Sequence, residues 1–222
     1  MNGKLIVIEG LDGSGKATQA KKLAQALQEQ GLSVMEITFP DYESDSSALV
    51  KMYLGGQFGS HPDDVNAYAA SAFYSVDRFA SYKMKWGEFY RQGGVIIADR
   101  YTTSNAVHQC SKISPEQWDD FLDWLFDFEY NKIAIPKPDQ VIYLDVDPQV
   151  SQALMTGRYK GDETKKDIHE KDVEYLARSQ RAAKYCADKL GWARVACCQD
   201  NAMRSIEQIH LDVLRVVKET LC

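Results

Sequence analysis

The sequence predicts an α/β fold: a doubly wound, five-stranded parallel sheet flanked by helices, formed by residues 1–222 as one domain. Short apolar runs alternate with longer amphipathic segments along the whole chain. Most of these runs are apolar on both faces, as the strands of a parallel sheet covered by helices must be. A glycine-rich turn follows the first run directly. The five strands are expected at 4–10, 33–39, 94–99, 140–146 and 193–198.

Helices are expected between these strands. Apolar residues three and four positions apart predict the first over 16–30, and Gly31 should end it. A long helix is expected to begin at Pro62, with Asp63 and Asp64 in its first turn, where acidic side chains are favourable.

The stretch "SPEQ" predicts a further helix start, with Ser114 as the N-cap, Pro115 at the first helical position and Gln117 completing a capping box. Right-handed crossovers between parallel strands would place the helices on both faces of the sheet. The remaining helices are expected to start at Asp147 and Pro148 and to fill 169–190 and 204–220.

The composition argues against several classes of function. A net charge of −6 and an isoelectric point near 5.3 disfavour nucleic-acid binding, which needs many basic groups facing phosphates. No apolar run approaches the roughly 18 residues of a membrane span, and the N-terminus enters a strand without a cleavage region. The five cysteines show no metal-ligand spacing, so we expect a reduced, cytoplasmic protein.

The glycine-rich turn carries a phosphate-binding pattern, G-x-x-x-x-G-K-[ST], of which Ala17 breaks only the last position. Backbone N–H groups and the dipole of the following helix bind anions there, and Lys16 adds a charge near the β- and γ-phosphates. Ala17 removes one magnesium ligand and leaves the anion site intact. A purely structural turn is the alternative. The expected ATP-binding residues are Gly10, Leu11, Asp12, Gly13, Ser14, Gly15, Lys16, Ala17 and Thr18.

Two further groups of residues point to the same kind of site. Asp99 ends the third strand, at the edge of the sheet where ligands of such folds bind, and its carboxylate can hold Mg²⁺. The guanidinium of Arg100 can donate two parallel hydrogen bonds to a phosphate. Tyr74 and Arg78 share a helix face, so that one ring can stack on a base and the guanidinium can bond its edge. Each has a structural alternative: a buried Asp–Arg pair in the first case, and a core aromatic beside a snorkelling arginine in the second.

Together these motifs resemble one family, the thymidylate kinases, over nearly the whole chain and in order. The resemblance implies a P-loop, nucleoside monophosphate kinase-like fold with a mobile lid. It implies phosphoryl transfer from ATP to dTMP, giving ADP and dTDP for dTTP synthesis, with Mg²⁺ and usually in a homodimer. The residues that carry it are "EGLDGSGKATQ" (9–19), "FP" (39–40), "YLGG" (53–56), Tyr74 with Arg78, "DRYTTSNAVHQ" (99–109) and "YLDVDP" (143–148).

The resemblance also implies individual roles. Asp12 would accept a hydrogen bond from the 3′-hydroxyl of dTMP, and Tyr74 would stack on thymine. Arg78 would donate to the thymine O4, and Arg100 would hold the monophosphate. The other substrate-binding residues expected are Phe39, Ser104, Asn105 and His108.

The sequence departs from the family pattern at three places. Asp41 and Tyr42 stand after Phe39–Pro40, where the family usually carries an arginine that touches the substrate phosphate. His108 occupies a position where a tyrosine commonly helps to exclude a 2′-hydroxyl. Gly13 stands where some members carry a catalytic arginine within the P-loop.

A polar, glycine-containing segment at 157–171 is expected to form the lid that closes over ATP, with a solvated charged loop as the alternative. The expected catalytic cations are Lys16, Arg100 and, from this lid, Arg158. Alternatives are another nucleoside or nucleoside monophosphate kinase of this fold, or an inactive ATP-binding protein. A regulatory GTPase is disfavoured because "NKIA" (131–134) lacks the aspartate of N-K-x-D.

The position of Arg158 leads to a first test. Arg158→Ala should lower the turnover number by orders of magnitude with smaller effects on substrate binding, because the charge acts mainly in the transition state. Arg158→Lys should recover only part of the rate, since a point charge does not reproduce a planar fork. Rates at saturating ATP and dTMP check this, and turnover of Arg158→Ala within a few-fold of wild type would remove Arg158 from the mechanism.

Overall fold

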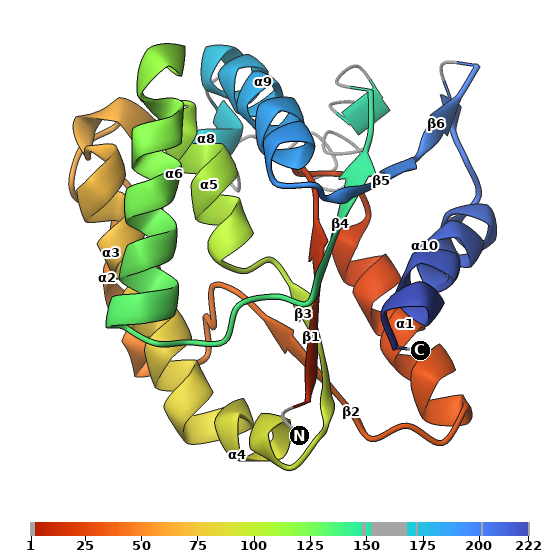
Figure 1. Ribbon diagram of the computed structural model, residues 1–222. Coiled ribbons are helices and arrows are strands. Elements are labelled where there is room, and N and C mark those ends of the chain that lie inside the picture. Colours follow the sequence, from red (N-terminus) through yellow and green to blue (C-terminus); the bar gives the residue numbers. More distant parts are fainter. Residues whose placement is uncertain (1–2, 148–149, 152–167, 172, 201, 222) are drawn as a thin grey trace.

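Five parallel strands form the centre of the molecule (Figure 1). A computed structural model describes residues 3–147, 150–151, 168–171, 173–200 and 202–221. The strand order is β2–β3–β1–β4–β5, so the fold class predicted from the sequence and the position of every predicted strand are confirmed. The strands are β1 (Lys4–Glu9), β2 (Val34–Thr38), β3 (Val95–Asp99), β4 (Gln140–Asp145) and β5 (Ala193–Ala196).

Alternating side chains of the sheet divide the core into two layers. On β1, Leu5 and Val7 belong to one buried cluster, and Ile6 and Ile8 belong to the other. Such burial stabilises the fold by roughly 25 cal/mol for each Å² of apolar surface removed from water. Helices α1 (Lys16–Glu29) and α10 (Ile206–Leu221) cover the second layer. The other long helices lie on the opposite face of the sheet (Figure 1).

The helices of this opposite face carry most of the residues predicted to bind the substrate. Two π-helices, η3 (Tyr82–Trp86) and η5 (Asp127–Lys132), interrupt the α-helical path. The α-helices there are α2 (Ala48–Leu54), α3 (Ala67–Ser81), α4 (Gly87–Arg91), α5 (Thr102–Cys110), α6 (Trp118–Phe126), α8 (Ile168–Lys171) and α9 (Val173–Lys189).

The predicted helix start at Pro62 is wrong by one turn. Pro62–Asp64 forms a separate 3-10 helix, η2, in which Asp64 Oδ2 accepts a hydrogen bond from the backbone N–H of His61 at 2.9 Å. This local bond closes the turn, the backbone becomes extended at Val65, and α3 begins afresh at Ala67. Asn66 caps α3 instead.

The capping box predicted in "SPEQ" is also absent. Ser114 occupies the N-cap position and Pro115 the first helical position, as predicted, but the first turn is the 3-10 helix η4 (Pro115–Gln117), which continues directly into α6 at Trp118. The Ser114 hydroxyl donates to Gln117 Oε1 at 3.3 Å, so the two side chains bond to each other and not to the backbone. A short antiparallel pair, β6 (Cys198–Gln199) with β7 (Ala202–Met203), was not predicted because two-residue strands have no periodicity.

The helix predicted to start at Asp147 and Pro148 is described only at Val150 and Ser151, both helical. The Ser151 N–H donates to the Asp147 carbonyl at 2.9 Å, a first helical hydrogen bond. Of the predicted lid, 157–167 lies outside the described residues, and so does Arg158. The last part, α8, is helical and buries Ile168 and His169, so it is not a solvated loop.

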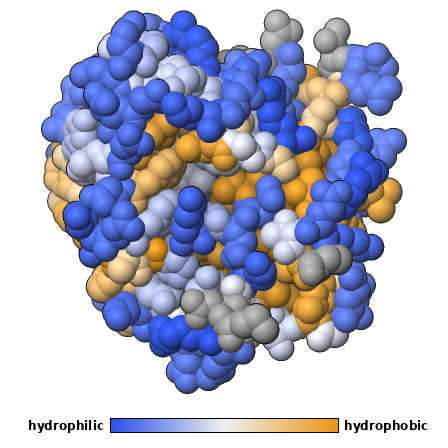
Figure 2. Space-filling model, in the orientation of Figure 1, coloured by the Kyte–Doolittle hydropathy of each residue, from blue (hydrophilic) through white to orange (hydrophobic). Residues whose placement is uncertain are grey.

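The surface is mostly hydrophilic on the face shown in Figure 2, and hydrophobic residues gather around a hollow near its middle. Within the described ranges, no helix combines the length and the apolar character that crossing a bilayer requires. Cys110, Cys186, Cys197 and Cys198 are free thiols, the first three of them buried.

Candidate active site

The P-loop joins the end of β1 to the start of α1, as the sequence predicts. Gly13 and Gly15 have φ angles of +78° and +85°, a left-handed conformation that glycine adopts without strain. A Cβ at Gly10 would lie 2.5 Å from the Ser14 hydroxyl, so the loop also needs glycine for space. Gly15 caps α1 without a side-chain hydrogen bond, which leaves the first N–H groups of the helix for an anion.

A cleft of about 800 Å³ opens beside this loop and brings together residues from distant parts of the chain. Its lining includes most of the residues that the sequence predicts for the site. They are Asp12 to Thr18 of the P-loop, Phe39, Tyr74, Arg78, Asp99, Arg100, Ser104, Asn105 and His108. The carboxyl ends of β1 and β3 meet here because the strands are parallel neighbours, with Ile8 opposite Asp99.

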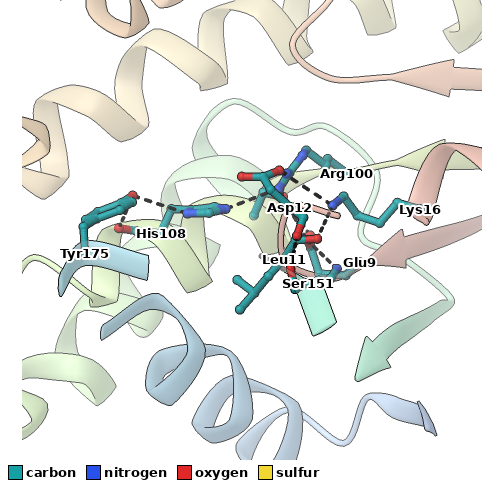
Figure 3. A network of polar contacts seen from close by, with 10 residues as sticks. Glu9, Leu11, Asp12, Lys16, Arg100, His108, Ser151 and Tyr175 are labelled. Carbon is teal, nitrogen blue, oxygen red and sulfur yellow. Dashed lines mark hydrogen bonds and ion pairs between the residues drawn. The ribbon is translucent and has the colours of Figure 1, made fainter. Parts of the chain in front are cut away.

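Arg100 stands at the centre of a polar network that links these strand ends (Figure 3). Its φ of +67° is left-handed, and its guanidinium forms a close ion pair with Asp12. The same guanidinium donates to the Ser104 hydroxyl at 3.2 Å and lies 3.8 Å from a Glu9 carboxylate oxygen. The Lys16 ammonium donates to the Leu11 carbonyl at 2.8 Å and lies 4.0 Å from Asp12 Oδ1.

The charges of this network shift one another's pKa values. Burial lowers the pKa of Arg100, but the carboxylates of Asp12 and Glu9 outweigh it and raise that pKa above its usual range. Burial raises the pKa of Asp12, but Arg100 and Lys16 together hold it below its usual range. Burial and the neighbouring Arg100 lower the pKa of Lys16 to about 8. Asp12 is therefore ionised at neutral pH, and Lys16 stays mostly protonated.

Glu9 is a site residue that the sequence prediction missed. It is buried and accepts hydrogen bonds from Gly10 N–H at 2.9 Å, Thr103 Oγ1 at 2.7 Å and Ser104 Oγ at 2.9 Å. These bonds tie β1 to α5, where several candidate substrate residues lie. A charged residue at the end of an otherwise apolar strand was the signal that could have identified it.

Asp99 fits the predicted magnesium site. Its Oδ1 is buried and accepts no hydrogen bond from the described residues, so an oxygen ligand is available in the cleft. No three acidic, histidine or cysteine side chains among the described residues are grouped so as to hold a metal ion. Mg²⁺ commonly keeps several waters and binds one or two carboxylates together with substrate phosphates. One carboxylate in a phosphate-binding cleft matches this pattern. The structural alternative required an ion pair between Asp99 and Arg100. Arg100 instead forms its close ion pair with Asp12.

Tyr74 and Arg78 both line the cleft, but Arg78 has a partner that the sequence did not suggest. Its guanidinium forms a two-pronged ion pair with Glu129, with Nε 2.9 Å from Oε2 and Nη2 bonded to Oε1. Both side chains are almost fully buried. Arg78 is therefore not a snorkelling arginine: its charge is compensated inside the protein.

His108 lies in the cleft within an aromatic and polar cluster (Figure 3). Arg100 Nη1 lies 3.3 Å from His108 Nε2 and can only donate, so Nε2 is unprotonated and Nδ1 carries the proton. Nδ1 lies 3.3 Å from the Tyr175 hydroxyl, which in turn donates to the His108 carbonyl at 3.2 Å. The His169 ring stacks on His108 with centroids 5.8 Å apart. Burial and Arg100 lower the pKa of His108 to about 3, so the ring is neutral.

The segment after Phe39–Pro40, where the resemblance would place an arginine, is held by contacts of Asp41. The Asp41 N–H donates to the buried Asp77 Oδ2 at 2.8 Å. The carboxylate of Asp41 lies 2.5 Å from the Lys85 ammonium. Asp41 therefore points to a lysine outside the cleft, and only Tyr42 of the two replacing residues lines it.

Two amides of α5 complete the cleft. Asn105 Nδ2 donates to the Ser71 carbonyl at 3.3 Å, which ties α5 to α3. Gln109 was not predicted: it lines the cleft, and both atoms of its buried amide group lack a hydrogen-bond partner within the described part of the chain. Its position one helical turn after Asn105 was the available signal.

Comparison with known proteins identifies the family. The sequence matches the family model described as Thymidylate kinase over residues 8–213, which is most of the chain. The chain belongs to the thymidylate kinase family. As a thymidylate kinase it phosphorylates dTMP.

Individual members of the thymidylate kinase family align with most or all of the chain. A probable thymidylate kinase of Staphylothermus marinus is 31% identical over 220 residues, which cover 99% of this chain and 97% of the relative. The thymidylate kinase of Mycobacterium tuberculosis is 30% identical over 177 residues, covering 79% of this chain and 81% of the relative. The solved structure of the Candida albicans thymidylate kinase has the same fold, with a TM-score of 0.71 at 22% identity, covering 98% of this chain and 92% of that one.

The neutral state of His108 should make the protein sensitive to acid. Because the folded-state pKa lies below the ordinary value of 6.5, the unfolded chain takes up a proton first. The stability from this group is present above about pH 6.5 and lost as pH falls toward the folded value. When the pH is lowered from 7 to 5, the free energy of unfolding should fall in both proteins. The fall should be about 1–2 kcal/mol smaller in His108→Gln than in wild type.

Urea denaturation at several pH values measures this difference. Both proteins should carry His169→Gln, because burial and His108 together lower the pKa of His169, which would otherwise change when His108 is replaced. Parallel curves for the two proteins would contradict the neutral assignment of His108.

Proposed function

We propose that the chain transfers the γ-phosphoryl group of ATP to dTMP with Mg²⁺, using the residues of the described cleft. The observation that carries this proposal is that one cleft joins an anion-binding P-loop to Arg100, Tyr74 and Arg78. A donor of phosphate groups and a nucleotide acceptor therefore have adjacent sites, as direct transfer between them requires.

The ATP half of the site is the loop from Gly10 to Thr18. The free N–H groups at the start of α1 would cradle the phosphates, and Lys16 would leave the Leu11 carbonyl to neutralise them. Asp99 would hold Mg²⁺ together with the phosphates and water. When bound, the ion supplies positive charge that neutralises the phosphate oxygens. Ala17 also lines the cleft, but its methyl group supplies no hydroxyl ligand for the ion.

The dTMP half lies along α3 and α5. Tyr74 would stack on thymine and Arg78 would donate to its O4. Ser104, Asn105 and Gln109 line the same cleft. Arg100 would hold the monophosphate, which then competes with Asp12 for the guanidinium. An Asp12 carboxylate released in this way is free to accept from the sugar hydroxyl. Phe39, whose ring centroid lies 5.8 Å from that of Tyr101, and His108 also line the cleft.

The reaction needs no side-chain base, because the attacking oxygen belongs to a monophosphate already ionised at neutral pH. The chain has to align two anionic groups and stabilise the charge that develops between them. Lys16, Arg100 and Arg158 are the cations we assign to this task.

We further propose a cytoplasmic homodimer. The free thiols of the described cysteines suit a reducing compartment. Tyr68, Val76 and Phe79 form an exposed apolar stripe on α3, and the following Met84 is 79% exposed. A second copy of the chain placed against this stripe would remove it from water.

Variants in the two halves of the site should affect different substrates. Lys16→Ala should abolish turnover while dTMP still binds, because Lys16 serves the ATP phosphates.

Tyr74→Ala should weaken dTMP binding by roughly 1–3 kcal/mol, the usual contribution of a base–aromatic stack, and leave the KM for ATP little changed. Steady-state kinetics with each substrate varied separately measures both effects.

Each of these variants is the control for the other. Equal losses for both substrates in Tyr74→Ala would return Tyr74 to a purely structural role, and near-normal turnover of Lys16→Ala would remove the P-loop from the mechanism. A panel of dTMP, dUMP, dCMP, dGMP and thymidine as acceptors separates dTMP phosphorylation from another kinase activity on the same fold.

Ala17 provides a test of the metal site. Ala17→Thr should lower the Mg²⁺ concentration that gives half-maximal activity, because a hydroxyl ligand is restored beside the phosphates. Activity titrated with Mg²⁺ at fixed ATP and dTMP measures this change. Ala17→Val is the matched control, because valine has a shape similar to that of threonine but carries no hydroxyl. An unchanged titration for Ala17→Thr would mean that this position does not face the metal.

A further inference from the structure

A buried carboxylate behind the cleft holds Arg78 in place. Glu129 belongs to the π-helix η5 and is fully buried. It accepts hydrogen bonds from Ser75 Oγ at 2.7 Å, from Thr102 Oγ1 at 3.0 Å, and from Arg78 through both Nε and Nη2. Each carboxylate oxygen thus has two donors, so the orientation of the carboxylate is fixed from α3 and from α5.

This arrangement also fixes the guanidinium. A guanidinium is planar, and a carboxylate that occupies its Nε–Nη2 edge determines where Nη1 points. Arg78 lines the cleft, and its Nη1 makes no hydrogen bond among the described residues. Nη1 is therefore the part of Arg78 that is available to a ligand.

The pairing also determines the kind of ligand atom that Arg78 can recognise. Both arginines have a carboxylate partner, but Arg78 and Glu129 are almost fully buried, whereas the side chains of Arg100 and Asp12 are 18% and 21% exposed, next to Lys16. An arginine whose charge is compensated by a fully buried carboxylate offers a directed N–H donor with little net attraction for a phosphate. A neutral carbonyl oxygen on a base edge suits such a donor.

We propose that Glu129 is a positioning residue for substrate selection: by holding the Nε–Nη2 edge of Arg78, it directs Nη1 to a carbonyl acceptor of the pyrimidine base. This inference rests on the proposed function, in which Arg78 contacts the thymine edge. It adds the reason why that contact selects an acceptor atom.

The experiment compares Glu129→Gln with wild type on two acceptors, dTMP and 5-methyl-2′-deoxycytidine 5′-monophosphate. The second base differs from thymine in carrying an amino donor in place of the O4 acceptor, with the ring-nitrogen proton lost. A glutamine side chain accepts through one oxygen and presents N–H groups to the other donors, so it cannot hold both prongs of Arg78. We expect the KM for dTMP to rise about tenfold, and kcat and the KM for ATP to change little. The preference for dTMP over the 5-methylcytosine nucleotide, measured as a ratio of kcat/KM values, should fall about tenfold.

Two other variants guard against a purely structural effect. Asp127→Asn changes a half-exposed carboxylate on the same π-helix and should leave the preference unchanged. Thr102→Val removes one donor to Glu129 with little change in shape, and should lower the preference in the same direction by a smaller factor. Thr102→Val keeps the test decisive if Glu129→Gln does not fold, as judged by circular dichroism.

Arg78→Met separates this inference from the proposed function. If Arg78→Met leaves the preference for dTMP unchanged, the proposed contact of Arg78 with the base is wrong. If Arg78→Met lowers the preference but folded Glu129→Gln and Thr102→Val do not, Arg78 reads the base without Glu129, and the positioning role is overturned.

Discussion

The parallel pairing of β1 with β3 is the constraint on which the site depends. It places Ile8 opposite Asp99, so that Glu9 and the P-loop leave the sheet at the same edge as Asp99 and Arg100. Arg100 N–H donates to the Ile8 carbonyl at 3.2 Å, which extends the pairing into the site itself. The cations and carboxylates of the cleft are neighbours because two apolar strands pair in this register, with β4 on the other side of β1.

Charge compensation explains how so many ionisable groups are tolerated there. Arg100 is paired with Asp12 and lies close to Glu9, while Lys16 bonds to a backbone carbonyl. These partners keep the cations oriented and offset part of the free energy lost when the charges are removed from water. In the proposed function a bound phosphate replaces the carboxylate of Asp12 as the partner of Arg100, and the cations are already oriented for it in the absence of a ligand.

Arg78 and His108 show a second use of buried polar groups in the cleft. Glu129 neutralises Arg78, and the cluster of His108 with Tyr175 and His169 holds an uncharged imidazole against Arg100. In the proposed function the acceptor side thus combines one partly exposed cation, Arg100, which can exchange Asp12 for a phosphate, with buried polar groups whose charge is absent or compensated. This division suits a nucleotide with an anionic end and a neutral base.

The sequence alone determined the strands, the P-loop and the resemblance to the family, because these depend on periodicity and on short motifs whose geometry is local. It also predicted most of the residues that line the cleft. It could not predict that Glu129 pairs with Arg78, 51 positions away, or that His108 meets Tyr175, 67 positions away. Such contacts depend on how α3, η5, α5 and α9 pack on the sheet. The errors at Pro62 and at "SPEQ" have a related origin, since local rules give helix-start residues without deciding whether a 3-10 turn or an α-helix follows. In each turn a side-chain hydrogen bond formed within the turn itself, from the His61 N–H to Asp64 and from Ser114 to Gln117, and only the three-dimensional structure shows which of the possible local bonds is made.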